Sequence, residues 1–169
     1  QNLSYYLFST IVQGFLALIG VLGTVAIFKI QLYENDASST TDFIKAFVTH
    51  YKGSIANGYS PEEMMNETEI ILKNPDNITY RDNIDVGYKK LKRILSEKSN
   101  IRKDMVDFAL WSFFDVSLAL IGIPLSKVLI VYKLNLLIAI YSIFDIGLSI
   151  GALVIAFILI KRILGYSFT

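Results

Sequence analysis

The chain has 169 residues, of which 53% are hydrophobic and 18% are charged, with a formal net charge of +1. A soluble domain usually carries about 25% charged residues, so this deficit excludes an ordinary soluble domain and indicates an integral membrane protein. The absence of cysteine excludes thiolate chemistry, and the single histidine excludes a histidine-rich metal site. A net charge so close to zero does not indicate a basic surface that binds nucleic acid. We therefore expect no nucleic-acid partner, no metal and no cofactor.

The first hydrophobic segment covers residues 5–30 and contains no charged residue before Lys29. At about 1.5 Å per residue, a helix of this length crosses a hydrocarbon core of about 30 Å. The segment lacks the basic leader of a signal peptide, and its apolar run is too long for one. We therefore predict that residues 1–30 form a retained transmembrane helix.

A stripe of small and polar residues runs along this first helix at spacings of 3, 4, 3 and 4. It consists of Thr10, Gln13, Ala17, Gly20 and Thr24. Small residues at helical spacing are typical of surfaces on which membrane helices pack. The alternative is a pore-lining face, in which Gln13 forms a polar ring in an oligomer.

The loop that follows, residues 31–104, is too long to lack structure, and helix signals divide it. Thr41 or Asp42 can cap a helix that ends near residues 53–58. Ser60-Pro61-Glu62-Glu63 is a capping box with proline at the first helical position. It predicts a second helix that stops before Pro75.

A third loop helix is predicted from about Thr79 or Asp82 towards Ser99, on an amphipathic stripe of apolar residues. Asn100 either breaks this helix or lies within a helix that runs directly into the second membrane span. The loop as a whole is therefore predicted to be a small helical subdomain, residues 31–104.

Basic residues cluster at the end of this subdomain. They are Lys89, Lys90, Lys92, Arg93, Arg102 and Lys103. A basic amphipathic helix beside a membrane can bind anionic lipid headgroups. The alternative is an ordinary solvated face that only enforces the orientation of the chain.

Two further hydrophobic segments are predicted to cross the membrane, at residues 106–123 and 134–160. Pro124 is expected to end or kink the first of them, and Lys161 and Arg162 close the second. The short connection, residues 124–133, predicts an antiparallel hairpin over residues 105–169.

Two acidic residues, Asp115 and Asp145, lie in these spans in near-identical Ser-x-Phe-Asp settings. A carboxylate at the centre of a membrane helix costs about 2.5–3.5 kcal/mol on insertion scales, and such residues usually mark functional sites. Each aspartate shares a helix face with small or hydroxylated residues. These are Ser112, Ala119 and Gly122 on one helix, and Ser142, Ser149 and Ala152 on the other. We predict one polar layer near mid-membrane.

The role of the two aspartates is left open by the sequence. They can line a polar pathway that attracts cations, or form a proton relay or a protonated Asp–Asp hydrogen bond. They can instead be structural acceptors for hydroxyl groups, or take part in subunit contacts.

Orientation is predicted from the basic residues. Fourteen of the sixteen Lys and Arg lie in or next to the loop and at the C-terminal end, and two lie in the 124–133 connection. Basic residues favour the cytoplasm. We therefore expect a multi-pass protein of the cell membrane. The N-terminus and the 124–133 connection are expected outside, and residues 31–104 and the C-terminus in the cytoplasm.

The run Tyr-Leu-Phe-Ser-Thr-Ile-Val-Gln at residues 6–13, continuing to residues 28–31, resembles the start of a group of small prokaryotic membrane proteins of unknown function. These proteins share a first span of this kind, a cytoplasmic helical loop and a C-terminal hairpin. The resemblance implies three transmembrane helices and a bacterial or archaeal source, and it implies no activity.

Catalytic motifs are absent from the sequence, including G-x-S-x-G, a phosphate-binding loop and H-E-x-x-H. We therefore expect an all-α integral membrane protein that is not an enzyme. The leading hypothesis is an oligomeric ion-permeable or ion-responsive protein. The alternative is a non-catalytic scaffold or accessory subunit. Expected partners are the lipid bilayer, copies of the chain or unlike membrane subunits, and anionic headgroups.

Overall fold

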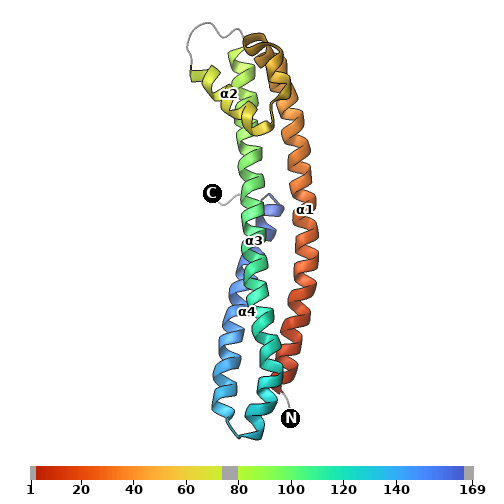
Figure 1. The fold of residues 1–169 in the computed structure, drawn as a ribbon, viewed down its shortest axis with the longest axis vertical. Coiled ribbons are helices and arrows are strands. Elements are labelled where there is room, and N and C mark those ends of the chain that lie inside the picture. Colours follow the sequence, from red (N-terminus) through yellow and green to blue (C-terminus); the bar gives the residue numbers. More distant parts are fainter. Residues whose placement is uncertain (1–2, 74–79, 166–169) are drawn as a thin grey trace. The chain divides into compact units, whose positions relative to one another are not determined.

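The computed structural model describes residues 3–73 and 80–165, and these are helical apart from short connections (Figure 1). In chain order the elements are α1 (Leu3–Lys52), the 3₁₀ helix η1 (Gly53–Gly58), α2 (Pro61–Lys73), α3 (Arg81–Val131) and α4 (Asn135–Ile163). No strand occurs in the described ranges. The predicted all-α class is therefore confirmed.

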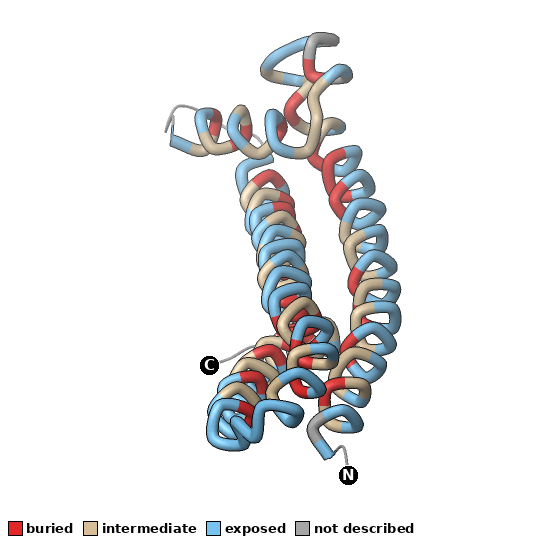
Figure 2. Tube along the Cα trace, turned by 60° about the horizontal axis from the view of Figure 1, so that its bottom comes forward, coloured by how far each residue is buried: buried red, intermediate tan, exposed pale blue. Residues whose placement is uncertain are grey.

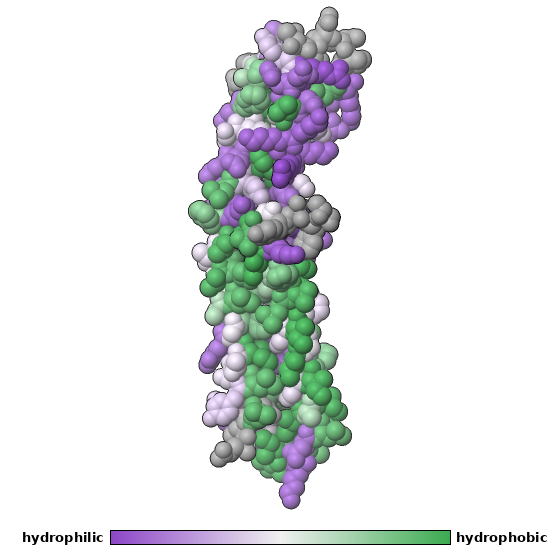
Figure 3. Space-filling model, turned by 180° about the vertical axis from the view of Figure 1, so that it is seen from behind, coloured by the Kyte–Doolittle hydropathy of each residue, from purple (hydrophilic) through white to green (hydrophobic). Residues whose placement is uncertain are grey.

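Three of these helices, α1, α3 and α4, are long and apolar enough to cross a membrane. Large hydrophobic side chains stay exposed along them, for example Phe113 at 66% and Ile143 at 70%. Figure 3 shows such side chains, in green, covering much of one face of the chain. Contiguous exposed apolar surface of this kind suits lipid rather than water. The predicted membrane class with three spans agrees with this finding.

The chain divides into two compact units. The first combines the residues up to Ile27 with those from Ile101 onward, and the second is Phe28–Asn100. Helices α1 and α3 each contribute residues to both units. The second unit overlaps the subdomain predicted at residues 31–104.

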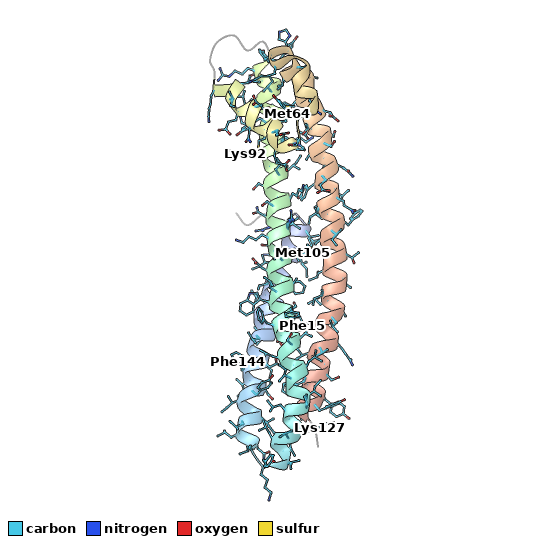
Figure 4. The ribbon with its side chains drawn as sticks, in the orientation of Figure 1. Phe15, Met64, Lys92, Met105, Lys127 and Phe144 are labelled. Carbon is cyan, nitrogen blue, oxygen red and sulfur yellow. The ribbon has the colours of Figure 1, made fainter. Side chains whose placement is uncertain are left out.

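The second unit has its own hydrophobic core, contributed by α1, η1, α2 and α3. Its buried members are Ala37, Ile44, Val48, Ala56, Met64, Ile71, Leu91 and Ile94. Buried positions appear in red in Figure 2, and Met64 is labelled in Figure 4. The helices approach closely here, because a Cβ on Gly87 would lie 2.7 Å from Cγ1 of Ile44.

The predicted capping box at the start of α2 is present. The backbone N–H of Ser60 donates to Oε2 of Glu63 at 2.8 Å, and the N–H of Glu63 donates to Oγ of Ser60 at 3.3 Å. Two backbone N–H groups that the helix leaves unpaired are thereby satisfied. Helix α2 ends at Lys73, and Pro75 lies outside the described residues.

The predicted helix start at Thr41 or Asp42 is wrong, because α1 is continuous from Leu3 to Lys52. Thr41 is only 3% exposed and lies inside the helix. The buried residues Ala37, Ile44 and Val48 extend the helix's packed face through this region. Tertiary packing has therefore overridden a local capping signal.

Helix α3 is also longer than predicted. Asn100 lies inside it, so the loop helix runs directly into the second span, which was one of the two alternatives. It begins at Arg81, while Thr79 lies outside the described residues.

Pro124 does not end the second span, because α3 continues to Val131. Proline removes one backbone donor, and the carbonyl that loses its helical partner is that of Leu120, four residues earlier. Nearby, Oγ of Ser126 donates to the carbonyl of Ile123 at 2.9 Å. The turn lies further along the chain, where Lys133 takes a positive φ of 56°.

Candidate functional site

The candidate site is the seam along which α3 and α4 pack antiparallel. Near one end, Nη1 of Arg162 forms an ion pair with Oδ2 of Asp104 at 2.7 Å. Further along, Ser149 contacts Asp115, and Tyr141 donates from its hydroxyl to the carbonyl of Leu118 at 2.5 Å. As residue numbers rise on α3, those of their partners fall on α4.

Small and polar residues occupy the buried face of each helix in this seam. On α3 they are Ser112, Asp115, Ala119, Gly122 and Ser126. On α4 they include Asp145, Ala152 and Ala156. Small side chains allow two membrane helices to approach closely. Both aspartates therefore lie on the buried faces of their helices rather than on the exposed apolar surface.

Asp115 has an exposed fraction of 0% and a hydrogen-bond donor on the other helix. The hydroxyl of Ser149 lies 3.0 Å from its Oδ1 and 2.9 Å from its Oδ2. This hydroxyl has one proton, so it satisfies only part of the acceptor capacity of the carboxyl group.

Asp145 is also 0% exposed, but neither of its carboxyl oxygens has a hydrogen-bond partner in the described part of the chain. It lies within electrostatic range of Asp115. An isolated charge in an apolar environment is very costly. Asp145 is therefore the least satisfied polar group of the seam.

The predicted serines do not all form hydrogen bonds with the carboxyl groups. Ser112 is fully buried, and its Oγ has no hydrogen-bond partner among the described residues. Ser142 is partly exposed. Of the three predicted serines, Ser149 is the one that contacts an aspartate. No group of three or more acidic or histidine residues in the described ranges is arranged to hold a metal ion.

Aromatic rings close the seam near the hairpin. The rings of Phe8 and Tyr141 meet edge to face, with centroids 5.6 Å apart. A Cβ on Gly122 would lie 2.8 Å from Cε1 of Tyr141 and 2.9 Å from Cε2 of Phe8. The space that these residues line has no room for a water molecule.

Phe8 and Tyr141 were not predicted as site residues. Tyr141 lies four residues before Asp145, so the helical period could have placed the two on one face. Nothing in the sequence indicates that Phe8 would reach the hairpin.

The predicted stripe on α1 does not pack within the chain. Its members Thr10, Gln13, Ala17, Gly20 and Thr24 are all exposed. The packed face of this part of α1 is instead formed by Phe8, Phe15, Leu22 and Ala26, of which Phe15 is labelled in Figure 4. Packing between chains, or a pore, stays a prediction for the stripe.

An apolar groove of about 490 Å³ lies beside the seam. It is lined by Asp107, Leu110, Trp111, Phe114, Leu118, Phe144 and Leu148, and Phe144 is labelled in Figure 4. Asp107 is its charged lining residue. The groove is open, and it does not include the two buried aspartates.

The basic residues of α3 are exposed at all six predicted positions. Lys89 pairs with Asp85 at 2.6 Å, and Nζ of Lys92, labelled in Figure 4, lies 5.6 Å from the ring centre of Tyr88. Lys90 and Arg93 have no ion-pair partner among the described residues. Binding of anionic headgroups stays a prediction.

No protein family, no curated protein and no solved structure matches this chain.

Proposed function

We propose that the protein is an oligomeric, ion-responsive or ion-permeable membrane protein. Its ion-binding element is the polar layer that Asp115 and Asp145 form between α3 and α4. The observation that carries the proposal is Asp145, a fully buried carboxyl group without a hydrogen-bond partner in the described part of the chain.

A purely structural acid would be expected to have its oxygens satisfied, because an unpaired buried polar group costs about 1–3 kcal/mol and a charge costs more. Asp115 is partly satisfied, because Ser149 donates a hydrogen bond to it. Neither oxygen of Asp145 accepts a hydrogen bond in the described part of the chain. A bound ion would supply the missing partner, and intramembrane acids commonly mark ion or proton paths.

Self-association is supported by the exposed stripe on α1. In the single chain, Gln13 and Thr10 are exposed on a helix that is long and apolar enough to cross a membrane. An amide facing lipid has no hydrogen-bond partner, whereas a neighbouring chain can provide one. We therefore propose that this stripe contacts another copy of the chain, or an unlike membrane subunit.

Ion flux into liposomes tests the proposal. The wild-type chain is compared with Asp115→Asn, Asp145→Asn and the control Asp107→Asn, which changes an acid outside the buried layer. Flux should fall about tenfold or more in the first two variants, by an estimate in which one lost interaction of about 1.4 kcal/mol lowers the rate tenfold. Unchanged flux in both variants would sink the proposal.

The second candidate is a non-catalytic scaffold or accessory subunit, and the Ser149–Asp115 hydrogen bond favours it. A hydroxyl–carboxyl pair between helices can fix their packing without moving any ion. This candidate predicts that Asp115→Asn alters the native mass in mild detergent and leaves flux unchanged. It also predicts that unlike subunits co-purify.

We further propose a location in the cell membrane, with the N-terminus and the 124–133 connection outside and residues 31–104 inside. Because the chain has no cysteine, single cysteines can report each side. A membrane-impermeant maleimide should label Lys133→Cys on intact cells and should label Lys90→Cys only after lysis. The reverse pattern would overturn the orientation.

A further inference from the structure

We propose that the ion bound in the polar layer is a proton and that Asp145 is the residue that binds it. Asp115, which is held by Ser149, is the second acid of the same layer. This inference rests on the proposed function, because it names the ion that the same layer holds.

The two aspartates have unequal surroundings, and this assigns the roles. Both are 0% exposed, yet Ser149 donates only to Asp115, at 2.9 and 3.0 Å from its two oxygens. Asp115 is therefore held in one orientation by a donor on the opposite helix. Both oxygens of Asp145 are free to accept a proton.

A metal ion fits this site poorly. Hard cations such as Ca²⁺ and Mg²⁺ take about six or more oxygen ligands in proteins. Among the described residues, no group of three acidic or histidine side chains is placed to supply them. The hydroxyl of Ser149 is already directed at Asp115. A proton needs one acceptor oxygen, and Asp145 provides two.

The presence of two carboxyl groups in one buried seam favours binding of a proton. Both side chains are 0% exposed, and Asp115 acts electrostatically on Asp145. Two like charges that are out of water do not both ionise readily, so one proton on Asp145 removes the repulsion. Uptake converts the carboxylate of Asp145 and a hydronium ion into a carboxylic acid and water, and release reverses this step.

Few other titratable groups face Asp145. From α3 the facing group is Asp115, and from α4 itself it is Tyr141, whose hydroxyl donates to the carbonyl of Leu118. Helix α1 has no titratable side chain between Tyr6 and Lys29. No cation in the described part of the chain forms an ion pair with either aspartate. A proton is therefore the simplest charge that can neutralise this site.

Infrared difference spectroscopy on the full chain in lipid vesicles tests the proposal directly. A carboxylic-acid C=O band should be present at neutral pH and lost at strongly alkaline pH. The band should be absent from Asp145→Asn and retained in the matched control Asp107→Asn. Excess Na⁺ or K⁺ should leave it unchanged.

Three outcomes would overturn the proposal. These are a wild-type chain without the band at neutral pH, a band that persists in Asp145→Asn, and a band that Na⁺ or K⁺ abolishes. The last of these would identify a metal-cation site instead. If Asp145→Asn fails to fold, Asp145→Glu keeps a carboxyl group, and its band should appear at a shifted position. An unshifted band in that variant would also contradict the assignment.

Labelling with a hydrophobic carbodiimide gives a second readout. A protonated carboxyl group adds to the reagent and rearranges to a stable N-acylurea, so the peptide containing Asp145 should gain the reagent's mass. Labelling confined to other acids counts against the proposal. Neither measurement requires transport. A proton on Asp145 together with unchanged flux in the aspartate variants would support this inference and overturn the proposed function.

Discussion

Asp115 and Asp145 stand in near-identical sequence settings but differ in what faces them across the seam. Ser149 donates a hydrogen bond to Asp115, whereas no hydroxyl donates one to Asp145 in the described part of the chain. Whether an aspartate has a hydrogen-bond donor therefore depends on the residue that faces it from the opposite helix. The neighbouring residues on the aspartate's own helix are nearly the same in both cases and do not explain the difference.

Replacing Ser149 with alanine removes the donor to Asp115. We expect this to weaken α3–α4 packing by about 0.6 kcal/mol and by no more than about 1.7 kcal/mol, the range of hydrogen bonds between membrane helices. A double-mutant cycle with Asp115→Asn, followed by unfolding in mixed detergent, measures the coupling. Ser142→Ala is the control, and purely additive effects of Ser149→Ala and Asp115→Asn would contradict the role of this bond.

At the scale of elements, local chemistry was predictable and long-range packing was not. The capping box of Ser60 and Glu63 depends on four successive residues, and the sequence revealed it. The continuity of α1 through Thr41 depends on contacts with other helices. The buried acids were found because a charge inside an apolar segment is visible in sequence. Their partners were not, because pairing across a hairpin depends on where it turns.

The position of the turn explains this failure in detail. A turn centred within residues 124–133 would place Ser142 opposite Asp115 and Ser112 opposite Asp145. The actual turn follows Val131, which shifts the register by about seven residues, or two helical turns. Ser149 thereby replaces Ser142, and Asp145 loses a facing serine.

A variant at Gly122 tests how tightly the rings of Phe8 and Tyr141 pack against α3 near the turn between α3 and α4. In Gly122→Ala the added methyl group must displace the rings of Phe8 and Tyr141, which would lie within 3 Å of it. We expect a loss of about 1–3 kcal/mol, typical of overpacking. Gly147→Ala is the matched control, because a Cβ there meets nothing within 4 Å. Equal stabilities of the two variants, measured by thermal unfolding in detergent, would contradict the close packing of the two rings on Gly122.

The start of α2 should respond to acid. Hydrogen bonds from the backbone N–H and hydroxyl of Ser60 lower the pKa of Glu63 below its ordinary value. Because the folded pKa is the lower one, this stabilisation is present above the unfolded pKa and is lost as pH falls through the folded pKa.

Amide hydrogen exchange measures that loss. Protection of the first turn of α2 should fall on acidification in the wild type and should change little with pH in Glu63→Gln. Glu62→Gln, at the neighbouring position, should behave as the wild type. Equal acid sensitivity of all three chains would argue against the capping contribution.

At the scale of the whole molecule, the chain combines a membrane-compatible unit with a second unit that has a core of its own. The first unit exposes large apolar side chains, and the second packs around Met64 and Leu91. The sequence predicted a polar helical subdomain between hydrophobic segments from the order of apolar and charged residues along the chain, because the two kinds of surface need different solvents.

Trp111, the single tryptophan, reports on the membrane assignment. It is 43% exposed and lines the open apolar groove. In vesicles, lipids with brominated acyl chains should quench its fluorescence, because a half-exposed ring beside an open apolar groove is accessible to acyl chains. Aqueous iodide should quench it weakly, and strong quenching by iodide alone would contradict a membrane-embedded α3.

The hydrogen bond between Ser149 and Asp115 also has a consequence for biosynthesis. The two residues are 34 positions apart, and ribosomes add about 5–20 residues per second. Asp115 therefore exists for about 2–7 s before its partner has been made, by the same rate estimate. During that interval α3 carries an unpaired acid, at a cost of about 2.5–3.5 kcal/mol if it enters lipid alone. Insertion of α3 and α4 together as one hairpin avoids that cost.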